Sequence, residues 1–311
     1  MSYLDSDKYY DHFSKKAFKS IPAFKREQNY MMSFVAPLES YSFDDNSLTI
    51  TYIKKGGGEL HWINGNGKKV DIKQNRFVVV DPNFGWHYIN ENSSDLDVLS
   101  LVISDELRKQ LNYYRTSSED KMLALPFEQV EGGLFYIENI LNADHYLTGQ
   151  SLKSIHSYAA TNGLKHYSPE EITIELLHQL YREKSNINAL AHRIKAKKSS
   201  TQVETLKRLM IVQEYIHDNL TREISLLELA DVSCLSKHHL FESFKRIYGK
   251  TPYQYIINEK INKSRDYLKS GEFAVNQVSA MLGFSDYSVF SKLFKKIHGI
   301  SPSHYVSNHS K

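Results

Sequence analysis

Near the C-terminal end of the chain, one stretch determines the fold expected for the last third: Gly283-Phe-Ser-Asp-Tyr-Ser-Val-Phe-Ser-Lys-Leu-Phe-Lys-Lys-Ile-His-Gly-Ile-Ser-Pro-Ser-His-Tyr305. Residues 275–282 are predicted to form a short helix, which Gly283 ends because glycine tolerates the left-handed conformation. Ser285 is predicted to cap a second helix. The apolar residues that recur on one face of that helix are Val289, Phe290, Leu293 and Phe294. The stretch therefore predicts two helices joined by a tight turn.

The same pattern occurs twice in the chain. Residues 225–255 repeat as residues 275–305, and Phe244-Lys-Arg-Ile-Tyr-Gly249 matches Phe294-Lys-Lys-Ile-His-Gly299 at an offset of 50. The preceding turns are offset by 49, so the second copy has one additional residue near the start of its second helix. An internal repeat of this length indicates two copies of one supersecondary unit.

A longer helix is predicted between the copies, beginning near Pro252 and ending at Ser270-Gly271. Its predicted buried face consists of Tyr255, Ile256, Ile261 and Leu268. Its predicted exposed cations are Lys260, Lys263, Arg265 and Lys269. These cations are either phosphate contacts or an ordinary solvated face.

Two short helices joined by a tight turn form a helix-turn-helix, whose second helix can enter the major groove of DNA, about 12 Å wide. The charge distribution agrees with this reading. The net charge of +3 combines a surplus of +5 over residues 205–311 with −2 over residues 1–204. A surplus of this size is compatible with an anionic partner and also with ordinary surface variation.

Residues 205–306 resemble the DNA-binding domain of AraC/XylS-type transcription regulators, because Gly283–Tyr305 matches the signature of that family almost completely. The resemblance implies two helix-turn-helix units joined by a long helix, reading two successive major grooves of double-stranded DNA. It also implies a homodimeric activator that recruits RNA polymerase.

Three features depart from the family pattern. Cys234 stands where the first turn usually has glycine, so that turn is expected to be strained or differently shaped. Lys260 and Ser264 replace the more usual Arg and Ala of the connecting helix. Glu242 occupies a groove-facing position, where it can accept from cytosine but repels phosphate.

Position within each second helix separates two sets of predicted DNA contacts. The predicted base contacts are Lys237, His238, Glu242, Tyr287, Ser288, Ser291 and Lys292. The predicted phosphate contacts, nearer the helix ends, are Lys245, Arg246, Lys295 and Lys296. Phe241 either packs inside or touches a thymine methyl group.

The first half of the chain is predicted to be mostly strand. The expected strands are residues 48–53, 59–63, 70–72, 77–80 and 96–103. Asn64-Gly65-Asn66-Gly67 is a strong hairpin signal between two of them. Short strands separated by turns favour an antiparallel barrel or sandwich.

Residues 81–90 resemble a degenerate second cupin motif. The resemblance implies a cupin-like β-barrel that binds a small-molecule effector, followed by helices that dimerise. The candidate effector-pocket residues are Tyr52, His61, Trp62, Trp86 and His87. Aromatic residues of this kind would fill a dry core equally well.

A metal-dependent cupin enzyme fused to a DNA-binding domain is an alternative, because Glu59 and His61 share one face of a strand and His87 could join them on a metal. Catalytic cupins usually supply a His-x-His pair, and this chain has a single histidine there. We therefore predict no enzyme, no metal and no cofactor. A helix-turn-helix module that binds protein instead of DNA is the other alternative.

The whole chain is predicted to be an α+β multidomain protein. Residues 1–190 form the cupin-like sensor and dimerisation domain, with helices expected around residues 135–141 and from Pro169 onward. Residues 191–202 form a basic linker, and residues 203–311 form the all-α DNA-binding domain. One cysteine, no apolar run of about 20 residues and no N-terminal signal pattern predict a cytoplasmic protein without membrane spans.

Overall fold

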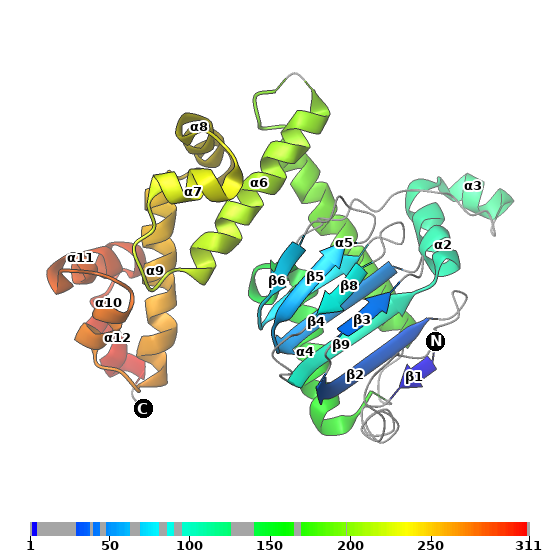
Figure 1. Cartoon of the computed structure of the whole chain (residues 1–311), viewed down its shortest axis with the longest axis horizontal. Coiled ribbons are helices and arrows are strands. Elements are labelled where there is room, and N and C mark those ends of the chain that lie inside the picture. The colour runs from blue at the N-terminus through cyan, green and yellow to red at the C-terminus, as the bar shows by residue number, and fades with distance from the viewer. Residues whose placement is uncertain are drawn as a thin grey trace. The chain divides into compact units, whose positions relative to one another are not determined.

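The computed structural model describes residues 2–4, 29–37, 40–43, 48–62, 69–80, 86–89, 95–125, 140–164, 169–196 and 198–309. The chain divides into two compact units, Met1–Asn186 and Ile187–Lys311, here called the N-terminal unit and the C-terminal unit (Figure 1). Over the described residues, every helix is too short or too polar to cross a membrane.

The N-terminal unit contains two β-sheets. The six-stranded sheet has the order β1 (Ser2–Leu4), β2 (Tyr30–Pro37), β9 (Asp95–Ile103), β4 (Leu48–Lys55), β7 (Arg76–Val80) and β10 (Ile140–Asn142). The four-stranded sheet has the order β3 (Ser40–Phe43), β8 (Trp86–Ile89), β5 (Gly58–Trp62) and β6 (Lys69–Ile72). Neighbouring strands are antiparallel except β1 and β2, which are parallel.

The predicted strands of this unit are confirmed. The continuous apolar runs form central strands of the six-stranded sheet. Strand β7 and most of β9 are buried along their length, as such runs indicate. Strands β5 and β6 pair antiparallel, with Leu60 opposite Val70, as the hairpin signal predicted. The turn itself, Asn64–Gly67, lies outside the described residues.

The prediction of a helix around residues 135–141 is wrong for the residues that the structure describes. Ile140–Asn142 is strand β10, which pairs antiparallel with β7. Ile140 and Leu141 are both buried, and an edge strand that completes a sheet buries such a pair as well as a helix does. Phe135 and Ile137 lie outside the described residues.

Helices complete the N-terminal unit. They are α2 (Asp105–Thr116), α3 (Glu119–Ala124), the 3₁₀ turn η1 (Ala143–His145), α4 (Leu147–Asn162) and α5 (Pro169–Ala191), whose last residues belong to the C-terminal unit. Helix α4 packs on the six-stranded sheet, against β2, β4 and β9 (Figure 1). Helix α5 begins at Pro169, as predicted, and its apolar stripe buries Leu176, Leu177 and Tyr181.

A buried hydrogen bond between His156 and Asp97 joins α4 to the six-stranded sheet. His156 Nε2 lies 2.6 Å from Asp97 Oδ1, and Lys54 Nζ lies 3.3 Å from the other carboxylate oxygen. Burial raises the pKa of Asp97, but the hydrogen bond and charge of His156, together with Lys54, outweigh it and hold that pKa below its usual range. The pair therefore stabilises the packing of α4 while Asp97 is ionised.

Asp97→Asn is expected to lower the stability of the N-terminal unit by about 1–2 kcal/mol at pH 7, because a charged hydrogen bond becomes a neutral one. Since the pKa of Asp97 is lowered on folding, this difference is complete above the unfolded pKa of about 4 and disappears as pH falls through the folded pKa. Urea unfolding from pH 7 to pH 3, followed by tryptophan fluorescence, measures it, because both tryptophans, Trp62 and Trp86, belong to this unit. A stability gap independent of pH would contradict the assignment.

The described part of the C-terminal unit is helical. Its helices are α6 (Ser199–Asp218), α7 (Leu226–Ser233), α8 (Lys237–Tyr248), α9 (Pro252–Ser270), α10 (Val275–Met281), α11 (Tyr287–His298) and α12 (Pro302–His309). Helix α8 packs on α9, and so do α10, α11 and α12 (Figure 1). Helix α9 ends at Gly271 in the left-handed conformation, as predicted. It therefore connects the two copies of the repeat.

Candidate nucleic-acid interface

Each copy of the repeat forms a helix pair, here called the first pair (α7 and α8) and the second pair (α10 and α11). Local sequence explains the boundaries of the first pair. Ser225 and Glu228 form a reciprocal capping box at the start of α7. Ser236 Oγ accepts from the backbone N–H of His239 at the start of α8, and Gly249 ends α8 in the left-handed conformation.

From the left-handed residue to the cap of the second helix, the second turn (Gly283–Asp286) is one residue longer than the first (Cys234–Ser236), as the repeat offsets predicted. Asp286, and not Ser285, caps α11: its Oδ1 accepts from the backbone N–H of Ser288 at 2.6 Å. The predicted cap at Ser285 is therefore wrong by one position, because the additional residue lengthens the turn before the helix. Gly283 adopts the left-handed conformation with φ of 72°, as predicted.

Cys234 occupies the left-handed position of the first turn, with φ of 51°. A side chain with a Cβ is disfavoured there relative to glycine. Cys234→Gly is therefore expected to stabilise the C-terminal unit by about 1 kcal/mol. Thermal unfolding followed by far-ultraviolet circular dichroism measures it, with Cys234→Ser as the control that removes the thiol and keeps the Cβ. Equal midpoints for both variants would show that the turn is unstrained.

Each pair has an aromatic core. Phe290 and Phe294 are fully buried and pack with Ile261 and Leu268 of α9. Phe244, the repeat equivalent of Phe294, is also fully buried. The predicted stripe of α11 is wrong at Val289, which is 47% exposed. That side of α11 lines a pocket instead of the core.

The predicted base contacts lie on the outer surface of α8 and α11. All are exposed except Ser291, which is half-buried. On α11 they lie at successive i, i+4 pairs (Tyr287 with Ser291, Ser288 with Lys292) and so share one face. Phe241 on α8 is half-buried, so its exposure lies between that of a core residue and that of the predicted base contacts. Most of the predicted base contacts are therefore accessible to a DNA groove.

The six predicted DNA-contacting cations are exposed: Lys237, Lys245, Arg246, Lys292, Lys295 and Lys296. Within the part of the chain that the structure describes, none of them forms an ion pair with an acidic side chain. Their charges are therefore not neutralised internally. When exposed cations of this kind bind phosphate, they release condensed counterions, and this release favours binding.

One prediction for the connecting helix α9 is wrong. Lys263, Arg265 and Lys269 of α9 are exposed as expected, but Lys260 is only 5% exposed. Lys260 lies in one i, i+4 row with Ile256 and Ser264, both buried, so it points inward. This row is the sequence signal that could have identified Lys260 as an interior residue.

The candidate effector residues are distributed over the two sheets of the N-terminal unit. His61 and His87 lie opposite each other on β5 and β8, as do Trp62 and Trp86. Tyr52 belongs to the other sheet, where its ring contacts His156 edge-on with centroids 5.6 Å apart. Burial, chiefly, raises the pKa of Tyr52 to about 12.

The proposed metal ligands on β5 are engaged with each other. Glu59 Oε2 lies 2.7 Å from His61 Nε2 and 3.1 Å from Lys69 Nζ. The hydrogen bond from Lys69, followed by that from His61, holds the pKa of Glu59 below its usual range. Among the described residues, no three His, Cys, Asp or Glu side chains are grouped so that they could hold a metal ion.

The domain family described as "Helix-turn-helix domain" matches residues 229–308. The probable transcriptional regulator LumQ of Photobacterium leiognathi is 31% identical over 104 residues, 33% of this chain and 42% of that protein. The MmsAB operon regulatory protein of Pseudomonas aeruginosa is 36% identical over 91 residues, 29% of this chain and 30% of that protein. The matches thus span less than half the length of these relatives.

Among solved structures, ToxT from Vibrio cholerae is similar with a TM-score of 0.33 and 16% identity, over 90% of this chain and 98% of that one. A transcriptional regulator from Chromobacterium violaceum, described as AraC-type, covers 33% of this chain and 93% of that one, at 21% identity and a TM-score of 0.32. Repeat, signature and family match agree over the same residues. The C-terminal part of this chain is a helix-turn-helix domain of the AraC/XylS type.

Proposed function

We propose that this chain is a sequence-specific, DNA-binding transcription regulator that places α8 and α11 in successive major grooves. The observation that supports it best is the pair of second helices, which expose the predicted contact residues and six cations without acidic partners. Exposed Glu242 on α8 is suited to a cytosine. The curated relatives that match this domain are named as transcriptional regulators.

The domain assignments form part of the proposal. Residues 1–190 act as a cupin-like sensor and dimerisation domain, residues 191–202 as a linker, and residues 203–311 as the DNA-binding domain. An effector bound in the N-terminal domain, or dimerisation through it, changes how the C-terminal domain meets its site. Regulation is by activation, through recruitment of RNA polymerase, and the chain has no catalytic role.

A groove between α4 and α5 supports the homodimer. Its apolar lining residues are Leu147, Ile155, Ile172 and Leu176, and its polar ones are Gln150, Ser151, Ser154, Glu171 and Glu175. Leu147 is 55% exposed. A second copy of the chain would cover this apolar surface. Sedimentation equilibrium tests it: a monomer at micromolar concentration would rule out a stable dimer.

Selection of duplexes from a random pool, followed by titration across salt concentrations, tests DNA binding. We expect enrichment of one sequence motif and an affinity that falls steeply as salt rises, because phosphate contacts release counterions. Failure to enrich any motif, together with no salt dependence, would refute the proposed function.

Lys292→Ala is expected to weaken binding to the selected duplex by about tenfold and binding to random duplex far less, because a base contact contributes about 1–3 kcal/mol of discrimination. Fluorescence anisotropy on both duplexes measures the ratio of the two losses. Ser303→Ala, an exposed change on α12, serves as the control. Equal losses on the two duplexes would reassign Lys292 to a phosphate contact.

A further inference from the structure

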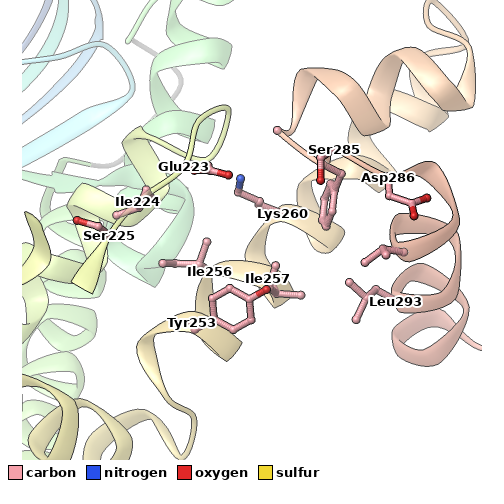
Figure 2. Close-up of a pocket in the computed structure, with 13 residues that line it drawn as sticks. Glu223, Ile224, Ser225, Tyr253, Ile256, Ile257, Lys260, Ser285, Asp286 and Leu293 are labelled. Carbon is pink, nitrogen blue, oxygen red and sulfur yellow. The ribbon is translucent and has the colours of Figure 1, made fainter. Parts of the chain in front are cut away.

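Lys260 joins the two helix pairs through backbone carbonyls. Its Nζ donates to the carbonyl oxygen of Arg222, 3.0 Å away in the loop between α6 and α7, and to that of Leu282, 2.8 Å away in the turn between α10 and α11. Figure 2 shows the Lys260 side chain leaving α9 toward the segment that carries Glu223. One ammonium group therefore bridges the loop that leads into the first pair and the turn inside the second pair.

Both helix pairs pack on α9, on either side of Lys260. The first pair contacts α9 through α8, whereas the second pair has its own core with Ile261 and Leu268 of α9. Beside Lys260 lies a pocket of about 410 Å³ instead of packed side chains, lined by Tyr253 and Ile257 of α9 and Val289 of α11, among others (Figure 2). The two hydrogen bonds of Lys260 therefore add a direct link between the α6–α7 loop and the α10–α11 turn, beside the packing of both pairs on α9.

Gly283 provides a second observation at the same point. A Cβ added there would lie 3.2 Å from Lys260 Nζ and 3.4 Å from the carbonyl oxygen of Thr221. The turn of the second pair thus approaches the α6–α7 loop closely, and a side chain at this position would crowd the Lys260 ammonium group. This close approach lets a single lysine reach both carbonyl groups.

We propose that Lys260 is a positioning residue that sets the spacing and angle between the two recognition helices, and thereby the spacing of the two half-sites that the protein accepts. Lys260 itself touches no DNA, because it is buried. The inference rests on the proposed function. Burial lowers the pKa of Lys260, and the charge of Glu223 opposes this effect.

Helical geometry makes the spacing measurable. One inserted base pair moves the second half-site by about 3.4 Å and rotates it by about 34° around the duplex. A rigid pair of recognition helices loses one half-site on such a duplex. A pair joined by a loose junction can follow the displaced half-site and gives up less affinity.

The experiment uses the full chain and the duplex selected in the binding test, with variants that carry one base pair inserted or deleted between the half-sites. Wild type is expected to lose roughly tenfold or more on the altered duplexes. Lys260→Met, which keeps the length and removes the donors, is expected to bind the selected duplex several-fold more weakly and to distinguish the three spacings by less than about threefold. Lys260→Arg, which keeps donors for both carbonyls, should restore the discrimination.

Lys263→Met is the matched control, because it removes an equal charge from the exposed side of the same helix. It should lower affinity on all three duplexes alike. If Lys260→Met does not fold, as judged by circular dichroism, Lys260→Gln replaces it, since its shorter stem cannot reach both carbonyl groups. Full spacing discrimination by the folded variant would overturn the inference, whereas failure of wild type to bind any selected duplex would refute the proposed function instead.

Discussion

Replacing Phe294 by alanine is expected to destabilise the C-terminal unit by about 3–5 kcal/mol, since a fully buried phenylalanine leaves a large cavity. Phe294 has ring contacts with Phe290, His298 and Tyr305, so it connects α11 with α12 as well as with α9. Whole domains are stable by only about 5–15 kcal/mol. The change should therefore remove much of the stability of the second pair and reduce specific DNA binding to the level of random duplex.

Urea unfolding followed by far-ultraviolet circular dichroism measures the loss, and tryptophan fluorescence reports separately on the N-terminal unit, which contains Trp62 and Trp86. Phe244→Ala, at the equivalent position of the first pair, should cost a similar amount. Val289→Ala on the half-exposed side of α11 is the control, with an expected change within about 0.5 kcal/mol. Equal costs for Phe294→Ala and Val289→Ala would show that the repeat core does not hold the second pair together.

Removing Lys295 and Lys296 together is expected to weaken DNA binding about 60-fold at 0.1 M salt, on specific and random duplexes alike. Each phosphate contact contributes about −0.9 to the slope of log affinity against log salt, so the double alanine variant should reduce that slope by about 1.8. Both side chains are exposed near the C-terminal end of α11. This uniform effect distinguishes them from the base contact expected of Lys292.

Titrations from 0.05 to about 0.3 M salt give both slopes directly. The control variant, Lys55→Ala with Lys73→Ala, removes two exposed charges from the N-terminal unit and leaves the C-terminal unit unchanged. An unchanged slope for the α11 variant would show that these lysines do not contact phosphate. A loss confined to the selected duplex would assign them to base recognition.

Much of the C-terminal unit could be predicted because its signals are local. A glycine or a capping serine constrains φ and the first hydrogen bonds of a helix without reference to distant residues, so Gly283, Gly271 and Pro252 were placed correctly. The strands of the N-terminal unit followed from β-branched runs for the same reason. The cap of α11 was misplaced by one residue, because Ser285 and Asp286 are both suitable caps.

The sequence by itself determined the two helix pairs, the helix that joins them and most of the side chains that α8 and α11 expose, because amphipathic periodicity decides which face of a helix is buried. Only the tertiary structure decided which contacts form where helices, strands and loops pack against one another. Ile140 and Leu141 became a strand because an edge of the sheet was open to them. Lys260 became a bridge because folding brought two carbonyl groups, 60 residues apart along the chain, within reach of one ammonium. Burying that charge is favourable only when both acceptors are in place, and no local pattern encodes their meeting.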